Sequence, residues 1–254
     1  SILFLFHAAW SKPLIVAHRG SSFDAPENTL PAFELAWKQG ADAIEGDFLL
    51  TKDNQIVCIH DGSTKRLADR NLAVRGSTLE ELRKLDVGSW KHEKFKGTKI
   101  PTIAEVFATI PKGRKIFVEV KCGKEIIPHL VKEIGKSKLK TEQVVLICFK
   151  QEVVKAFKQA LPKNKAYWLS GFKKNEEGVW KPTLETVLTT LKESKADGLD
   201  SHHGIPGTVA KKIMTEGYEW HAWTVNDLAT AKKLKAIGIH SITTDRPALI
   251  KSSL

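Results

Sequence analysis

The sequence contains little cysteine: only Cys58, Cys122 and Cys148 occur among its 254 residues. An odd number of cysteines cannot pair completely within one chain, and all three fall in apolar runs typical of strands. We therefore predict that they are reduced core residues. A reducing compartment suits this usage, and export remains an alternative because exported proteins can lack disulfides.

A long apolar run is also missing. The apolar stretch over residues 1–10 is far shorter than the roughly 20 residues that a membrane-spanning helix requires. It is either the tail of a signal sequence, although it shows no basic n-region, or a segment that closes the floor of a barrel, and the second interpretation is favoured. We expect no stable membrane insertion, and both a cytoplasmic and an exported location stay open.

Acidic residues are fewer than basic ones, 29 against 40, which gives a formal net charge of +11. Such a charge attracts anions, among them phosphate esters, nucleic acids and anionic membranes. Most lysines, however, lie in helical patterns where they form a solvated face, as at Lys232, Lys233 and Lys235. No basic stripe is interleaved with aromatic residues, so we do not expect nucleic-acid binding.

The chain is rich in short β-prone runs that alternate with longer amphipathic patterns, which is typical of βα units around a parallel sheet. Eight such units close a TIM barrel, and no linker divides the chain. We therefore predict one α/β domain, a (β/α)8 barrel, over residues 1–254. The predicted strands cover residues 14–17, 43–47, 116–121, 144–149, 166–169, 197–200, 220–225 and 240–243.

Residues 55–60 break this rhythm. They form a ninth strand-like run, yet only residues 51–54 separate them from the continuation of the second strand, far fewer than the roughly dozen residues of a parallel crossover. We predict a hairpin whose return arm brings His60 to the rim that bears the end of the second strand. Residues 61–101 contain turn residues, charges and a short helical pattern, and we predict that they form a small insertion capping the C-terminal face of the barrel.

Acidic residues lie at the ends of the second and third predicted strands, where functional residues of such barrels gather. Glu45 and Asp47 are two positions apart and point the same way, and Glu119 can face them. Two carboxylates about 4 Å apart repel by about 4 kcal/mol at an effective dielectric near 20, so the cluster requires protonation or a cation. An all-oxygen set favours one divalent cation, Mg²⁺ or Ca²⁺, with Mn²⁺ also compatible. Alternatively, these acids pair with Arg19 or Lys121 in a buried ion network.

Two histidines are expected at the same rim, His18 from the first predicted strand and His60 from the hairpin. A lone histidine at a strand end is more often a hydrogen-bonded core residue, but two beside three acids indicate catalysis. Imidazoles change charge near neutral pH, so one can deprotonate an attacking hydroxyl or water while the other protonates the departing alkoxide. This arrangement suits displacement at phosphorus.

Other rim residues fit the same chemistry. Arg19 and Lys121 would bind the phosphate oxygens, where negative charge gathers in the transition state. Trp223 offers an apolar wall for the alcohol portion of a substrate, or else packs within the barrel.

Six motifs in this order resemble the glycerophosphodiester phosphodiesterases: LIVAHRG, APENTLPAF, GADAIEGDFLLTKDNQIVCIHD, FVEVK, HAWTVN and ITTDRP. The resemblance spans Leu14 to Pro247. It implies a barrel with an inserted cap, a divalent cation held by the three acids, and acid and base roles for the two histidines. It also implies hydrolysis of a small phosphodiester, a glycerophosphodiester, to glycerol 3-phosphate and an alcohol.

The same resemblance assigns further residues. Glu27 and Asn28 match the family's Glu-Asn-Thr element, so Glu27 belongs to the substrate-binding set and orients Arg19 or His18, whereas Asn28 is a candidate helix cap. Gly46 and Phe48 flank Asp47 where larger aliphatic residues are frequent in the family, and we expect them to alter the width of the site.

Several alternative activities stay open. Relatives on this barrel cleave lysophospholipids or form cyclic phosphates, and fold likeness does not separate these from simple hydrolysis. A barrel glycosidase would use Glu45 and Glu119 but would leave both histidines and Arg19 without a role. A protein that binds anions without catalysis is the remaining alternative.

Overall fold

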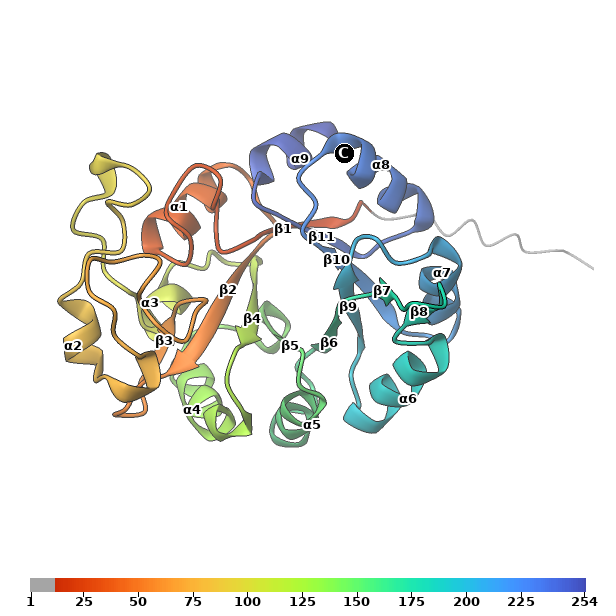
Figure 1. Cartoon of the computed structure of the whole chain (residues 1–254), viewed down its shortest axis with the longest axis horizontal. Coiled ribbons are helices and arrows are strands. Elements are labelled where there is room, and N and C mark those ends of the chain that lie inside the picture. Colours follow the sequence, from red (N-terminus) through yellow and green to blue (C-terminus); the bar gives the residue numbers. More distant parts are fainter. Residues whose placement is uncertain (1–11) are drawn as a thin grey trace, which may run out of the picture.

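A computed structural model describes residues 12–254, so both interpretations of residues 1–10 lie outside the described residues. Eight parallel strands close into a barrel, because β1 (Leu14–Ala17) pairs with both β2 (Ala43–Leu50) and β11 (Ser241–Thr244) (Figure 1). The predicted TIM barrel is confirmed. The other barrel strands are β4 (Lys115–Val120), β5 (Val144–Cys148), β6 (Ala166–Ser170), β9 (Gly198–His202) and β10 (Glu219–Trp223).

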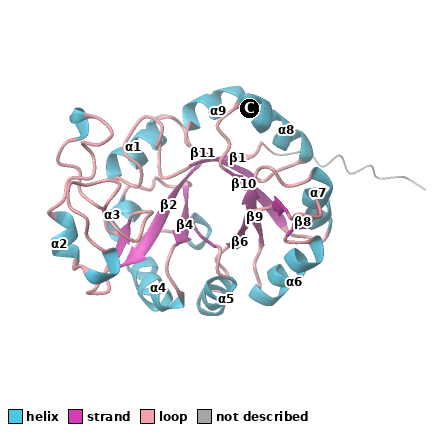
Figure 2. Ribbon diagram, viewed as in Figure 1, coloured by secondary structure: helices cyan, strands magenta, loops and turns pink. Residues whose placement is uncertain are grey.

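Helices surround the barrel on its outside, and at least one follows each barrel strand (Figure 2). Each presents a buried apolar stripe to the strands, as α5 does with Val153, Val154 and Phe157. No helix in the described part of the chain is long and apolar enough to cross a membrane. The helices are α1 (Leu30–Lys38), α3 (Ile103–Ala108), α4 (Ile127–Lys136), α5 (Gln151–Ala160), α6 (Leu184–Ser194), α7 (Gly207–Thr215), α8 (Leu228–Ile237) and α9 (Pro247–Ser253).

Short elements complete the connections between strands and helices. The turns η3 (Lys124–Ile126) and η4 (Thr141–Gln143) flank α4. Between β6 and α6, the strands β7 (Lys173–Lys174) and β8 (Trp180–Lys181) form a two-stranded antiparallel hairpin.

The predicted hairpin is confirmed. The strand β3 (Ile56–Cys58) pairs antiparallel with the end of β2, with Phe48 opposite Cys58 and Leu50 opposite Ile56. This pairing explains why β2 continues to Leu50, beyond the predicted end at residue 47.

Residues 61–101 lie beside the barrel, next to α1 and α3 (Figure 1). They contain η1 (Val74–Gly76), α2 (Leu79–Arg83) and η2 (Glu93–Phe95). This segment reaches the barrel mouth, the carboxyl end of the strands, where Lys91 Nζ donates to the backbone oxygen of Ser22 at 2.8 Å. Together with Val57 and Ile59 from the arm of the hairpin, its side chains form a small separate core that contains Leu67, Val74, Leu82, Val87 and Ile100.

Alternation along β2 separates two environments. Glu45 and Asp47 point into the barrel, whereas Gly46 and Phe48 point outward. A side chain at Gly46 would lie 3.2 Å from both Phe33 and Cys58, so the missing side chain makes room for the outer core. The expectation that Gly46 and Phe48 alter the width of the site is therefore wrong, because both belong to the opposite face of the strand.

The cysteines are free, as predicted. Cys58 and Cys148 are buried, and Cys122 is half-buried just after β4. Burial raises the pKa of Cys148 to about 12 and also raises the pKa of Cys58, so neither thiol forms a thiolate readily. We interpret them as packing residues.

Candidate active site

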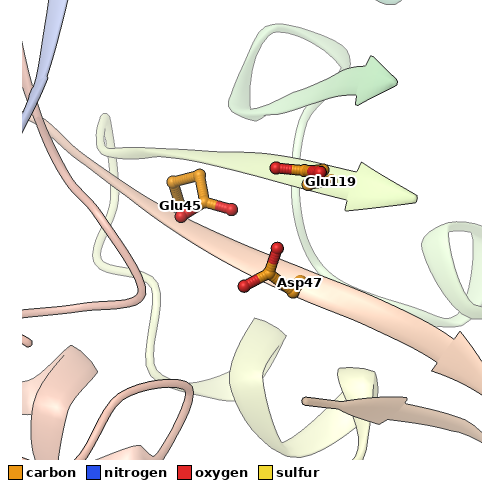
Figure 3. Close-up of side chains that lie close together, drawn as sticks. All are labelled: Glu45, Asp47 and Glu119. Atoms are coloured by element: carbon orange, nitrogen blue, oxygen red, sulfur yellow. The ribbon is translucent and has the colours of Figure 1, made fainter. Parts of the chain in front are cut away.

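The three predicted acids meet at the barrel mouth. Glu45 and Asp47 lie on β2, and Glu119 lies on β4 directly opposite Asp47 in the strand register (Figure 3). One carboxylate oxygen from each lies within 4.8 Å of the others, and all three side chains are buried. The convergence results from strand alternation, which places every second side chain inside the barrel.

Two positively charged side chains contact this cluster of acids. Arg19 Nε lies 3.2 Å from Asp47 Oδ2, and Lys121 Nζ lies 2.7 Å from Glu119 Oε1 and 3.5 Å from Asp47 Oδ1. The ion network considered as an alternative is thus present. It does not satisfy the cluster, however, because Glu45 Oε1 and Asp47 Oδ1 are buried without a hydrogen-bond partner.

The pKa values of the acids reflect this imbalance. Burial, together with the charges of Asp47 and Glu119, raises the pKa of Glu45 well above its ordinary value. Burial alone would also raise the pKa of Asp47, but the charges of Arg19 and Lys121 outweigh it and lower that pKa. Burial and Asp47 raise the pKa of Glu119. Three carboxylates against two cations leave the cluster short of positive charge.

A hard divalent cation fits the residues that are present. The donors are all carboxylate oxygens, which Mg²⁺ and Ca²⁺ prefer. The unpaired oxygens of Glu45 and Asp47 would gain a partner, and the repulsion that raises the pKa of Glu45 would be relieved.

His18 follows β1 at the mouth, where a carboxylate from the other end of the chain orients it. Its Nδ1 lies 2.7 Å from Asp245 Oδ1, just after β11, the strand that pairs with β1. Asp245 is held in turn by Asn226 Nδ2 at 2.6 Å and Ser22 Oγ at 2.9 Å. Burial alone would raise the pKa of Asp245, but the hydrogen bond with His18 lowers it to about 2. Asp245 therefore stays charged and holds Nδ1, so the other ring nitrogen, Nε2, does not take part in this contact.

His60 has the same kind of partner on the other side. Its Nδ1 lies 2.6 Å from Asp61 Oδ1, and its Nε2 lies 3.2 Å from Lys121 Nζ. Arg66, from the inserted segment, fixes Asp61 through Nε at 2.8 Å and also binds both oxygens of Glu27. The two histidines thus share one arrangement, an imidazole held at Nδ1 by a carboxylate that is itself anchored.

The turn after β1 places Arg19. Its φ is 55°, and that of Gly20 is 80°, where a side chain at Gly20 would lie 2.6 Å from the backbone of Ala32. In this conformation the Arg19 N–H donates to Glu45 Oε2 at 2.9 Å, while Nη1 donates to Glu27 at 3.0 Å. Glu27 therefore orients Arg19, one of its two expected partners, and within residues 12–254 it forms no hydrogen bond or ion pair with His18.

Asn28 has a different role from the cap we considered. Thr29 is the N-cap of α1, since its side chain accepts from the Ala32 N–H. The Asn28 side chain instead binds Asp47, with Nδ2 donating to Oδ2 at 2.8 Å and Oδ1 accepting from the backbone N–H at 3.0 Å.

A pocket of about 160 Å³ opens at the mouth between these groups. Trp223 forms part of its wall, packed edge-to-face against Phe149 with ring centroids 5.7 Å apart. Glu27 does not line this pocket and lies instead along an outer depression with Phe23 and Trp90. The pocket is lined by His18, Arg19, Glu45, His60, Glu119, Lys121, Ile147, Phe149, Leu169, Asp200, Trp223, Thr224 and Thr243.

Sequence reasoning missed the residues that support the site. Asp61 directly follows His60, and Asp245 ends the strand beside the first in a closed barrel, so both left a usable signal. Asp200 ends the predicted strand 197–200, which is also a usable signal, whereas Arg66 left none, because only the folded chain shows what it faces.

Comparison with known proteins gives one consistent result. The sequence profile of the glycerophosphoryl diester phosphodiesterase family matches residues 18–249. A glycerophosphodiester phosphodiesterase of Caldanaerobacter subterraneus subsp. tengcongensis is 32% identical over 241 residues, covering 93% of this chain and 95% of that relative. One from Bacillus subtilis is 28% identical over 253 residues, covering 93% and 84%.

Solved structures agree. A phosphodiesterase of Oleispira antarctica, solved in complex with the product sn-glycerol-3-phosphate, superposes with a TM-score of 0.86 at 28% identity. The superposition covers 95% of this chain and 96% of that one.

Proposed function

This chain belongs to the glycerophosphoryl diester phosphodiesterase family of phosphoric diester hydrolases, and we propose that it hydrolyses a glycerophosphodiester to glycerol 3-phosphate and an alcohol. One observation carries the proposal: two carboxylate-held histidines and two cationic side chains line the same pocket as Glu45 and Glu119 of the acidic cluster. The product bound to the Oleispira antarctica phosphodiesterase supports glycerol 3-phosphate as the product here.

In this proposal Arg19 and Lys121 bind the phosphate oxygens. Both side chains are four-fifths buried, so their charges act in a region of low dielectric. Burial would lower the pKa of Lys121, but Glu119 and Asp47 outweigh it and raise that pKa, which keeps the ammonium charged. Fixed positive charge at this position stabilises the negative charge that develops on phosphorus oxygens.

The two histidines transfer protons on the two sides of the phosphate. Each has its Nδ1 against a carboxylate, so Nε2 is the atom that exchanges a proton. One imidazole takes the proton of the attacking water, and the other gives a proton to the leaving alkoxide. After one turnover the two have exchanged protonation states, and solvent restores them.

A divalent cation, Mg²⁺ or Ca²⁺, held by Glu45, Asp47 and Glu119 would polarise a phosphate oxygen when bound. The carboxylates hold the site ready for it, Asn28 fixes Asp47, and the Arg19 N–H fixes Glu45. Hydrogen bonds to the residues that hold a metal ion orient those residues and tune their affinity for the ion.

The test is a panel of diesters, among them glycerophosphocholine and glycerophosphoethanolamine, assayed after exhaustive chelation and again with Mg²⁺, Ca²⁺ or Mn²⁺ restored. We expect release of glycerol 3-phosphate that chelation abolishes and a divalent cation restores. Turnover that survives chelation would refute the role of the cation. Phosphorus NMR of the same reactions would reveal a cyclic phosphate, the product expected from internal attack.

A further inference from the structure

One buried carboxyl group in the pocket has no role in the reaction described above. Asp200, on β9, is 1% exposed and lines the pocket with the two histidines. Its Oδ1 has no hydrogen-bond partner, and no ion pair among the described residues includes it. It also stands outside the acidic cluster that Glu45, Asp47 and Glu119 form.

An unpaired buried carboxyl is costly, because it has lost water without gaining a partner. Burial and the negative charge of Glu119 raise the pKa of Asp200 well above its ordinary value. A carboxyl group in this condition both donates and accepts hydrogen bonds when protonated. Asp200 lines the pocket, so a ligand bound there can supply the partner that Oδ1 lacks.

The surroundings of Asp200 indicate what kind of ligand this is. The apolar residues of the pocket are Ile147, Leu169, Phe149 and Trp223. Leu169 lies opposite Asp200 in the strand register, and Trp223 Nε1 donates to the Asp200 backbone oxygen at 3.3 Å. A pocket that combines apolar walls with a few polar groups recognises a small molecule by a few hydrogen bonds. The whole pocket, including the part lined by the two histidines, measures about 160 Å³, which matches a short polyol in size.

Charge decides which part of the substrate lies there. Arg19 and Lys121 attract the phosphate to their side of the pocket. The carboxyl group of Asp200 offers no positive charge to a phosphate oxygen, whereas hydroxyl groups pair with a carboxyl group in either protonation state.

We infer that Asp200 and the apolar walls around it form a polyol subsite that binds the hydroxyl groups of the glycerol arm of the substrate. The inference rests on the proposed function and extends it, because it assigns the selectivity for glycerol to a named residue. Asp200 is a specificity residue in this scheme, and the reaction at phosphorus proceeds without it.

The experiment compares two ligands that differ only in hydroxyl groups. Binding of glycerol 3-phosphate and of propyl phosphate is measured by calorimetry on the full chain with Mg²⁺ or Ca²⁺ present. For the unaltered protein we expect glycerol 3-phosphate to bind about 10- to 100-fold more tightly. Asp200→Leu should abolish this preference and leave the affinity for propyl phosphate within about threefold. Asp200→Asn should keep most of the preference, because an amide also pairs with hydroxyl groups.

Ser201→Ala is the matched control. Ser201 is the next residue on β9, but its side chain faces the outer core, where it accepts from Trp220 Nε1 at 3.0 Å. It should not change the preference. If Asp200→Leu does not fold, Asp200→Ala replaces it with the same expectation.

Three results would overturn the inference. The first is that the unaltered protein does not prefer glycerol 3-phosphate over propyl phosphate. The second is that Asp200→Leu or Asp200→Ala keeps this preference. The third is that the variant loses affinity for both ligands equally. The proposed function fails separately, if the unaltered protein hydrolyses no glycerophosphodiester although it binds glycerol 3-phosphate with the expected preference.

Discussion

Asn28 holds Asp47 at two points, because its Nδ2 donates to the carboxylate at 2.8 Å and its Oδ1 accepts from the backbone N–H at 3.0 Å. Asn28 reaches this position with a φ of 57°, in the left-handed region that asparagine tolerates better than most residues. A short polar side chain in a turn thus fixes the orientation of a buried acid on a neighbouring strand.

Removing the amide should weaken the cation site. In Asn28→Gly, glycine keeps the left-handed backbone, but Asp47 loses both contacts. We expect the affinity for Mg²⁺ or Ca²⁺ to fall about 10- to 100-fold, as for other residues that orient metal ligands. Calorimetric titration with the cation measures this. Asn54→Gly is the control, because Asn54 has a φ of 58° in the turn between β2 and β3, where its side chain accepts from Arg75 and not from the acids' backbone. An equal loss there would contradict the assignment.

Replacing either histidine should remove catalysis and leave cation binding intact. We expect His18→Ala and His60→Ala each to lower kcat by about 10² to 10⁴, the usual contribution of a positioned acid or base. With a nitrophenyl diester, whose leaving group needs no proton, the variant that lacks the general acid should recover most of its rate. His129→Ala, on the outer helix α4, serves as the control. If both variants recover equally, the two histidines do not have separate acid and base roles.

Asp245, the carboxylate that holds His18 Nδ1, should contribute to the rate of the reaction. Asp245→Asn keeps the size of the side chain, but an amide no longer stabilises the imidazolium or fixes its tautomer. We expect kcat to fall by at least about 10², with a smaller change in KM. A double variant with His18→Ala should be no slower than His18→Ala alone, because Asp245 acts through His18.

The lowered pKa of Asp245 also predicts how the stability of the protein changes in acid. Its pKa of about 2 in the folded protein lies below its ordinary value of 3.8, so the folded state binds fewer protons than the unfolded state between these values. Its contribution is therefore complete above pH 3.8 and is lost as the pH falls toward 2. The Asp245 side chain is 29% exposed, so solvent screens its interactions, and we expect a contribution of about 1 kcal/mol at neutral pH. Denaturant unfolding of Asp245→Asn should show this loss at pH 6 and a flatter pH dependence below pH 4.

The raised pKa of Glu45 predicts the opposite dependence of stability on pH when the protein lacks its cation. Its pKa is raised on folding, so the folded state binds more protons than the unfolded state, and stability falls as the pH rises above 4.5. In chelated protein, Glu45→Gln should therefore raise the melting temperature at pH 7 to 8. It should also reduce the stabilisation that Mg²⁺ or Ca²⁺ gives the unaltered protein, about 2.7 kcal/mol at 100 times Kd. Calorimetric melting with and without cation measures both effects, and a lower melting temperature for the chelated variant would count against the cluster.

Much of this protein was determined by local patterns in its sequence. The first predicted strand, residues 14–17, coincides with β1, and the spacing of Glu45 and Asp47 placed both on the inner face of β2. The short connection over residues 51–54 predicted the hairpin that returns His60 to the mouth. These predictions succeed because they depend on the twofold period of a strand and on the length of a connection, which are properties of a few adjacent residues.

Only the tertiary structure decided which partners these residues have. His18 and Asp245 are 227 positions apart, and they meet because the barrel closes between its first and last strands. Arg66 reaches Glu27 and Asp61 from an inserted segment that no periodicity describes. The role inferred for Asp200 depends on the lack of a hydrogen-bond partner for its Oδ1, which only the complete set of surrounding side chains shows. A strand period states which face a side chain occupies, but the register of the closed barrel determines what stands opposite.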